Sequence, residues 1–565
     1  MKKDNKITRE LALYGLIFLA ALALRLINLG RVPLLESEAN WAIQAWQLSL
    51  KESIPVGSQV GYLSITEGLF KLFEGSNFLA RLWPAVIGSL LIWLPFYFRE
   101  ELNRVPALVL AAGLALDPAL VPVSRQAGGP MPALVFLALA VGTFHARKIT
   151  WGFFFLGMGL FSGPDFWTGF LLLLISALVS MRLDLFNARD YFKVRLENFQ
   201  KGSENWLTTI IPALLGLLVI GTFFFRNYQG LVAWAGSLGD FVRSLGGPAG
   251  LRTGKFVVYF LINNPLILVF GVVGFVAAWL SGERFGKGLS IWFAVSLLGL
   301  LIYPQRQAFD QIWLVLPLWI STATIMVHFF RLAPNTWVTH TLAGLVVTLA
   351  SLNWLTLIGL IFRGTNQNTL LLELGLFLAS LALLILSSTV VSSEWGLNFA
   401  WKGLVTGGAF ALLLFLISSL SLDAYVRDKD PRAIFTEGSG KGQMKLLVDS
   451  IADASITATG RPDSIQGAVI GDSDALRWAL REYEEVDFLI NPLSGMEYPF
   501  LITTGEGDIP EMQENYRGQD FVLSSAPGWE GVLPNNWISW IAFREGPITT
   551  EYLILWVRND IYSGY

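Results

Sequence analysis

The sequence predicts a polytopic α-helical membrane protein with a small α/β domain at its C-terminal end. Of its 565 residues, 53% are hydrophobic and only 15% are charged, whereas a soluble globular chain carries about a quarter charged residues. The apolar residues are grouped in runs close to the length that crosses a bilayer, which is about 20 residues. After about residue 424 no run is long enough to span, and Asp, Glu, Gly and Pro become frequent.

The charge balance and the rare residue types exclude several kinds of site. Lys and Arg number 40 against 43 Asp and Glu, which gives a net charge of −3 and argues against a nucleic-acid partner, because such a protein needs a basic face. The chain has no Cys, so disulfides and thiolate metal sites are excluded. Its three His lack ligand spacing. We therefore expect no cofactor, with a divalent cation held by carboxylates as the open alternative.

About thirteen apolar segments are expected before residue 424. The first, at 11–29, precedes many others, so we expect a retained helix rather than a cleaved signal peptide. The short runs 151–162 and 165–181 are separated by Gly and Pro and predict two half-deep helices that meet at a break. The other runs lie near 78–98, 105–122, 131–145, 207–225, 258–280, 288–303, 312–330, 337–362, 370–390 and 402–422.

The distribution of basic residues predicts the orientation. The N-terminal lysines and most other Lys and Arg between the segments fall on one side if the helices alternate, and cytoplasmic loops carry this excess. We expect a multi-pass protein of the plasma membrane with its N-terminus in the cytoplasm. Residues 1–423 would form the membrane domain and residues 424–565 an extracytoplasmic domain.

The C-terminal domain is expected to combine strands and helices. A buried strand at 467–472 ends in a turn, and Ser473 is a candidate N-cap for a helix at 474–482. Further strands are predicted at 486–490, 499–504, 521–524, 537–543 and 552–557.

Charged residues beside the spans are the first candidates for a functional site, because charges near a bilayer are costly. Glu36 and Glu38 come directly after the first span and lead into a helical stretch at 39–50. A carboxylate at the membrane surface can act as a general base that removes a proton from an acceptor hydroxyl. The alternative is an exposed acidic turn that caps this helix from its N-terminal end.

Four further residues are candidates for substrate binding. Arg125 could pair with one of the two glutamates or bind a phosphate, or it could simply snorkel at a helix end. Arg306 and Asp310 flank a helix start on the same side, where a lipid phosphate would lie, and an internal ion pair explains them equally well. Asp165, at the break between the two short helices, could face a cavity or cap the second helix.

The order of these features resembles the GT-C class of membrane glycosyltransferases. The closest likeness is to the family of polyprenyl-phosphate-mannose protein mannosyltransferases and lipid A aminoarabinose transferases. The family's pattern D-E-A-x-Y-A reads Ser37-Glu38-Ala39-Asn40-Trp41-Ala42 in this chain. Residues 124–126 are similar to the family's second outer loop, 162–164 to its K-G-P-like break, and 303–306 with 316–318 to its late loop and proline-containing helix.

The resemblance implies an inverting transferase that moves a sugar from a polyprenyl-phosphate donor to an acceptor at the outer membrane face. Glu38, with Glu36 as its neighbour, would be the base. Arg125 and Arg306 would hold the donor phosphate and stabilise its charge as it leaves. The implied partners are the polyprenyl-phosphate-linked sugar, membrane lipid, and a glycan, lipid or protein acceptor.

Two departures from the family keep a second function open. Ser37 stands where the family commonly has its catalytic Asp, and residues 127–129 lack the acid that the second loop commonly carries. The chain could therefore be a GT-C scaffold without catalysis, a structural or assembly subunit that binds a membrane protein partner. An enzyme needs one of the glutamates in a cavity shared with Arg125 or Arg306 and open to lipid, whereas a scaffold has these groups neutralised. A transporter is less favoured, because transporters place their charges near the membrane midplane.

Overall fold

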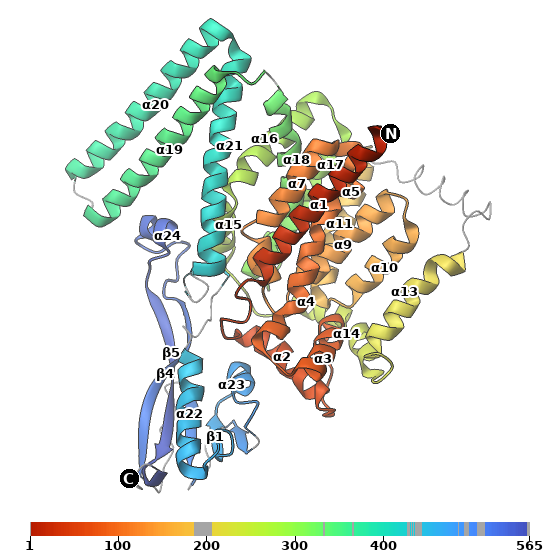
Figure 1. The fold of residues 1–565 in the computed structure, drawn as a ribbon, viewed down its shortest axis with the longest axis vertical. Helices are drawn as coiled ribbons and strands as arrows, with labels where there is room; N and C mark the ends of the chain where they lie inside the picture. Colours follow the sequence, from red (N-terminus) through yellow and green to blue (C-terminus); the bar gives the residue numbers. More distant parts are fainter. Residues whose placement is uncertain are drawn as a thin grey trace.

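The computed structural model shows a helical bundle with a sheet domain at one end, far from the N-terminus of α1 (Lys2–Leu26) (Figure 1). The structure describes the whole chain except residues 1, 186–205, 332–333, 364–366, 427–429, 431, 433, 436–442, 484, 491–496, 505–514 and 562–565.

Seven described helices are long and apolar enough to cross a membrane. They are Asn77–Tyr97, Pro164–Arg182, Arg284–Ile302, Ala308–Arg331, Trp337–Gly359, Asn368–Trp395 and Leu397–Ser421. An eighth span is added if the bent pair α15 (Thr253–Asn263) and α16 (Pro265–Ser281) is counted as one. The expected count of about thirteen segments is not confirmed, because several of the predicted runs form helices of only 12 to 15 residues. The polytopic helical architecture itself is confirmed.

The spanning helices are joined by shorter helices, several of which lie at the end of the bundle that faces the sheet domain (Figure 1). Besides α1, α15 and α16, the α-helices of the bundle, spanning and connecting, are α2 (Glu36–Ser49), α3 (Val60–Phe73), α4 (Asn77–Leu90), α5 (Leu94–Tyr97), α6 (Arg99–Leu102), α7 (Arg104–Leu116), α8 (Leu120–Ser124), α9 (Met131–His145), α10 (Ile149–Leu160), α11 (Pro164–Arg182), α13 (Trp206–Gly221), α14 (Gln229–Ser244), α17 (Arg284–Ile302), α18 (Ile312–Arg331), α19 (Trp337–Arg363), α20 (Gln367–Trp395) and α21 (Leu397–Ser421).

The break predicted between the runs 151–162 and 165–181 is present, between α10 and α11. Gly163 adopts φ +80°, a left-handed value that glycine reaches without strain. Pro164 then occupies the first position of α11, where its missing N–H costs nothing. The expectation of two half-deep helices is wrong for the second one, because α11 has 19 residues and is long enough to span.

The C-terminal domain contains a five-stranded sheet with the order β2-β1-β3-β5-β4. β1 pairs in parallel with β2 and β3, and β5 pairs antiparallel with β3 and β4. The helices α22 and α23 pack on one sheet face, where the alternating apolar residues of the strands form the domain core. The elements are α22 (Gln443–Thr459), β1 (Gly467–Ile470), α23 (Asp474–Ala479), β2 (Val486–Leu489), β3 (Phe500–Thr504), β4 (Tyr516–Pro527), α24 (Trp537–Phe543) and β5 (Ile548–Arg558).

Five of the six predicted strands are present, and the sixth is a helix. Ser473 caps α23 as predicted, because its hydroxyl accepts a hydrogen bond from the backbone N–H of Leu476 at 3.2 Å. Residues 537–543, expected as a strand, form α24. A short apolar run does not distinguish a buried strand from a buried helix. Here Trp540 is fully buried, with its ring stacked on that of Tyr259 in α15 at 5.6 Å.

The sheet domain is attached to the bundle through α23. Trp478 is 3% exposed, its ring centroid lies 5.6 Å from that of Phe70, and its indole N–H donates to Asn77 Oδ1 at 2.7 Å. The guanidinium of Arg481 lies 4.2 Å from the Trp478 ring centroid and donates to the carbonyl of Gly75 at 2.9 Å. Burial lowers the pKa of Arg481 from its ordinary value. An aromatic side chain thus holds the two parts of the chain together.

We expect Trp478→Ala to loosen the attachment of the sheet domain. Removing a buried Trp costs about 3–5 kcal/mol, and most of that loss falls on the contacts with α3 and α4. Hydrogen exchange of the α23 backbone should then become faster by at least an order of magnitude. Trp537→Ala is the matched control, because Trp537 is 48% exposed. Equal protection of α23 in both variants would contradict this role for Trp478.

Candidate functional site

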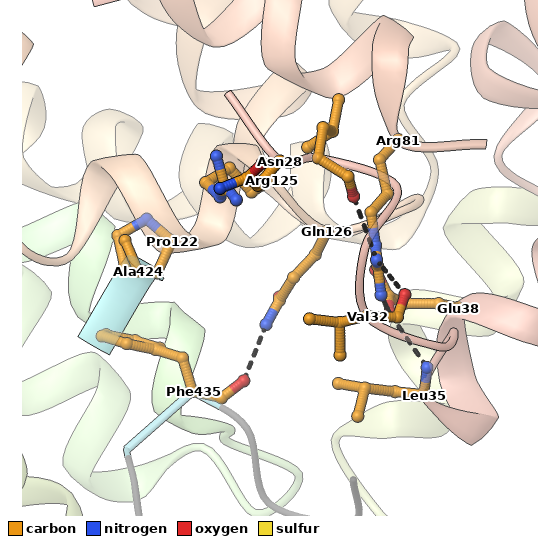
Figure 2. A pocket seen from close by; sticks show the side chains of 11 residues that line it. Asn28, Val32, Leu35, Glu38, Arg81, Pro122, Arg125, Gln126, Ala424 and Phe435 are labelled. Atoms are coloured by element: carbon orange, nitrogen blue, oxygen red, sulfur yellow. Dashed lines mark hydrogen bonds and ion pairs between the residues drawn. The ribbon is translucent and has the colours of Figure 1, made fainter. Parts of the chain in front are cut away.

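The Glu38 carboxylate is buried and its hydrogen-bonding capacity is filled. Arg81 of α4 binds both oxygens, with Nε 2.8 Å from Oε1 and Nη2 2.5 Å from Oε2 (Figure 2). The backbone N–H of Leu35 donates to Oε2 at 2.9 Å, and that of Ala127 donates to Oε1 at 2.8 Å. Two carboxylate oxygens offer about four lone-pair positions. Glu38 therefore has no position left for an acceptor hydroxyl in this arrangement.

Arg81 also donates hydrogen bonds to the backbone that follows α1. Its guanidinium donates to the carbonyls of Leu29 at 3.2 Å, Val32 at 2.8 Å and Pro33 at 3.0 Å. Arg81 is absent from the residues selected from the sequence. The signal for it was present, since it is the single charge in the apolar run 78–98, and a charge in such a run is a functional candidate by default.

Glu36 holds the sheet domain. One oxygen accepts the backbone N–H of Asp474 at 2.8 Å, and the other accepts the N–H of Ala475 at 2.9 Å and the Ser473 hydroxyl at 3.2 Å. The acid thus satisfies N–H groups in the first turn of α23, which have no partner within their own helix. Both glutamates selected from the sequence have structural contacts.

Arg125 binds the backbone at the end of α1. Its Nη1 donates to the carbonyls of Leu24 and Arg25, each at 3.2 Å, and of Ile27 at 2.7 Å. The guanidinium lies 4.9 Å from the ring centroid of Tyr425. The glutamates proposed from the sequence as its partners are bonded elsewhere, Glu38 to Arg81 and Glu36 to the first turn of α23.

Glu38 and Arg125 nevertheless line one cavity, and a shared cavity of this kind is expected of an enzyme (Figure 2). Its volume is about 70 Å³. Gln126 crosses one side and donates to the carbonyl of Phe435 at 3.0 Å. This Glu38 cavity is too small for a sugar unless these side chains move.

Arg306 closes the end of α17 in the same manner. Its Nη1 donates to the carbonyls of Leu301 at 3.2 Å and Tyr303 at 2.6 Å, and Nη2 donates to the Thr253 hydroxyl. The Nε of Arg306 is buried and has no acceptor among the described residues.

Asp310 is buried and does not pair with Arg306. Its Oδ2 accepts the backbone N–H of Gln307 at 2.8 Å, at the start of the short helical turn before α18. The predicted ion pair between Arg306 and Asp310 is therefore wrong. Arg306 binds backbone carbonyls at the end of α17, whereas Asp310 binds a backbone N–H before α18.

Asp165 is a half-buried carboxylate near Asp310. It lies in the first turn of α11, where Gly163 is the N-cap and makes no side-chain cap bond. No hydrogen bond or ion pair joins Asp165 to any residue that the structure describes. Its charge lies close enough to repel that of Asp310.

Tyr303 completes the group that we call the Asp165 cluster: Asp165, Asp310 and Tyr303. Burial raises the pKa of the Tyr303 phenol, its hydrogen bond with Ser244 at 2.9 Å lowers it, and the nearby charges of Asp310 and Asp165 raise it further. The structure thus brings Asp165, Asp310 and the Arg306 loop together. Glu36, Glu38 and Arg125 belong to a separate group of contacts.

An apolar groove leads to this cluster from the side of the bundle. It has a volume of about 330 Å³, and α11, α14 and α17 line it, with Tyr303 at one end. Ile175 and Leu245 in its walls are 39% and 47% exposed. Two of the three helices, α11 and α17, are long and apolar enough to span, so we expect the groove to open toward lipid. The groove lies beside the Asp165 cluster, and neither of the two glutamates lines it.

Metal-binding groups of three or more His, Asp or Glu side chains are not found among the described residues.

Comparisons with known proteins show the fold. No protein-family model matches the chain, and no curated protein does. The chain is similar to the crystal structure of ArnT from Cupriavidus metallidurans bound to undecaprenyl phosphate, with a TM-score of 0.53, 14% sequence identity, and 96% of this chain and 97% of that chain covered. The apo state of the same protein gives a TM-score of 0.51 at 12% identity, with 98% of each chain covered. The resemblance to the lipid A aminoarabinose transferase, a GT-C glycosyltransferase, is therefore confirmed at the level of the fold.

We expect Glu38→Gln to destabilise the protein strongly. The change leaves the buried Arg81 cation without a counter-charge, which costs about 3–5 kcal/mol, and it turns an amide N–H₂ toward N–H donors. Thermal unfolding in detergent should show a large fall in midpoint temperature. Glu52→Gln, at an exposed acid that follows α2, should leave the midpoint nearly unchanged. If both variants unfold at the wild-type temperature, the ion pair is not a stabilising contact.

Proposed function

We propose that this chain transfers a sugar from a polyprenyl-phosphate donor to an acceptor hydroxyl, and that Asp165 is the general base. The observation that carries the proposal is an apolar groove that ends at Tyr303, close to Asp165. The Asp165 carboxylate has no hydrogen-bond partner among the described residues. The polyprenyl tail would lie in the groove. The sugar and phosphate would lie at the Asp165 cluster, at the level where headgroups meet the hydrocarbon.

The residues of this region suit an inverting displacement. Asp165 takes the proton of the acceptor hydroxyl as its oxygen bonds to the anomeric carbon. The bond from that carbon to the phosphate oxygen breaks, and polyprenyl phosphate leaves. A phosphate oxygen is the acceptor that the buried Nε of Arg306 lacks. The proposal needs no cofactor, and a divalent cation, if one takes part, would find oxygen ligands on Asp165 and Asp310.

In this proposal the reaction takes place on the outer side of the plasma membrane. The start of α11 lies beside α3, at the end of the bundle that carries the sheet domain (Figure 1). Helix α5 lies toward the other end, and the basic residues Arg99, Arg104, Arg147 and Lys148 are in or next to α6, α7 and the turn after α9, with Lys148 over the Tyr97 ring of α5 (Figure 1). An excess of basic residues is typical of the cytoplasmic side. The N-terminus would therefore be cytoplasmic and the sheet domain extracytoplasmic. The acceptor can be a glycan, a lipid or a protein.

A second function is supported by a different observation. Glu36 and Glu38 are both bonded to other parts of the chain, and Ser37 stands between them. A GT-C fold that has given up catalysis at this loop would keep such contacts as a scaffold and bind a membrane protein partner. This scaffold needs neither a donor lipid in the groove nor a free carboxylate at Asp165.

Native mass spectrometry of the gently extracted protein distinguishes the two functions. A transferase should retain polyprenyl phosphate, with or without a sugar, and the mass of the adduct gives the sugar class. We expect Asp165→Asn to retain more of the sugar-bearing donor than the wild type, because binding persists while proton removal fails. Retention of other lipids without any polyprenyl species would favour the scaffold. An identical ratio of the two donor forms in both proteins would reject Asp165 as the base.

We expect Ile175→Trp to reduce donor retention by filling the groove. Ile175 lines the groove and is 39% exposed, so the larger side chain blocks the tail without entering the core. Leu178→Trp is the matched control, because Leu178 is on the same helix, is 49% exposed and lies outside the groove lining. The fraction of protein that carries a polyprenyl adduct should fall several-fold in the first variant alone. Equal loss in both would place the tail elsewhere.

A further inference from the structure

A basic cavity lies toward the end of the bundle that is remote from the sheet domain, where the segment from α5 to α6 meets the turn between α9 and α10 (Figure 1). Its volume is about 590 Å³. Arg99, Arg147 and Lys148 line it together with one carboxylate, that of Glu100. A net positive cavity at a helix-bundle end is suited to an anionic group.

The three cations have no carboxylate partner among the described residues. Two of them lie over aromatic rings. The Arg99 guanidinium is 4.5 Å from the ring centroid of Phe96, and Lys148 Nζ is 5.5 Å from that of Tyr97. A cation held by a ring face still has N–H groups to donate. These contacts position the charges without neutralising them.

The backbone at Arg147 shows that this side chain is placed at a steric cost. Helix α9 ends in a turn in which the N–H of Lys148 bonds the carbonyl of Thr143 at 2.8 Å and the N–H of Arg147 bonds that of Phe144 at 3.1 Å. This turn puts one residue in the left-handed region and normally uses Gly there. Arg147 occupies that position with φ +58°.

A separate apolar cavity lies next to the basic one. It has a volume of about 200 Å³, and its lining side chains, from α5, α9, α11, α17 and α18, are aliphatic or aromatic. Val141 lines this cavity and His145 lines the basic one, and the two lie one turn apart on α9. The ring of Phe98, which also lines the apolar cavity, stacks on that of His145 at 4.7 Å. A polar compartment and an apolar compartment are therefore adjacent.

We propose that these two cavities form a binding site for one anionic phospholipid of the membrane leaflet on the N-terminal side. The phosphate lies among Arg99, Arg147 and Lys148, and part of one acyl chain enters the apolar cavity beyond Phe98. Charge complementarity selects an anionic headgroup, and the adjacent apolar cavity selects a lipid over a free phosphate. The site lies away from the Asp165 cluster and does not depend on the transfer reaction.

Lipid retention by the full-length protein in detergent tests the site. Dioleoylphosphatidylglycerol and dioleoylphosphatidylcholine share their acyl chains and differ in net charge, and their adducts can be counted by native mass spectrometry. The wild type should retain the anionic lipid in preference. Arg147→Gln/Lys148→Gln should lower that retention by about tenfold or more. Arg284→Gln/Lys287→Gln removes the same charge near the N-terminal end of α17, outside the cavity, and is the matched control.

Arg147→Gly separates binding from folding. Glycine adopts a positive φ without the steric conflict of a side chain, so this variant should unfold at the wild-type temperature or above it. It should still lose most of its preference for the anionic lipid. Val141→Phe, which narrows the apolar cavity and leaves every charge in place, should also lower retention of the anionic lipid.

Four results would overturn the proposal. The first is equal retention of the two lipids by the wild type. The second is an equal effect of the two double variants. The third is displacement of phosphatidylglycerol by glycerol 3-phosphate, which would make the cavity a site for free phosphate esters. The fourth is displacement by undecaprenyl phosphate at equimolar concentration, which would assign the cavity to a polyprenyl lipid.

Discussion

The buried ion pair between Glu38 and Arg81 is the contact on which this end of the bundle depends. It joins α2 to α4, and the remaining bonds of the same two side chains hold the end of α1 and the loop at Ala127. Withdrawing two charges from water is costly, and the cost is recovered only when all their oxygens and N–H groups are bonded. A carboxylate held in this way has no lone-pair position left for an acceptor hydroxyl. A transferase built on this fold therefore needs its base at another position, and Asp165 is a carboxylate near a lipid-facing groove that the fold leaves unbonded.

The arginines at this end of the bundle share one structural role. Arg81 and Arg125 donate to carbonyls that follow or end α1, and Arg306 does the same for α17. The last carbonyls of a helix lack partners within the helix, and near hydrocarbon they cannot rely on water. A guanidinium with five N–H donors can satisfy two or three of them and retain capacity. This role explains why the cations do not pair with the nearest acids in sequence, and it leaves the Nε of Arg306 without an acceptor among the described residues.

Composition and local pattern predicted the features that depend on neighbours in sequence. The apolar runs, the break at Gly163, five strands and the Ser473 cap all follow from such patterns. Three features depend on distant contacts and could not be predicted in this way. The helix at Trp537–Phe543 forms because Trp540 packs on Tyr259. The partner of Glu38 is 43 residues away, and the number of spans depends on how far each apolar run continues as a helix.

The sheet domain is attached to both sides of the candidate site. On one side, Glu36 and Trp478 bind it to α2, α3 and α4, beside the Glu38 ion pair. On the other side, Lys255 in α15 donates to the carbonyl of Trp529 at 3.0 Å, and the same helix carries the Thr253 hydroxyl that binds Arg306. A body attached at two separated points cannot rotate about either one. The domain therefore links the loop of the two glutamates to the helix that binds Arg306, beside the end of the groove at Tyr303.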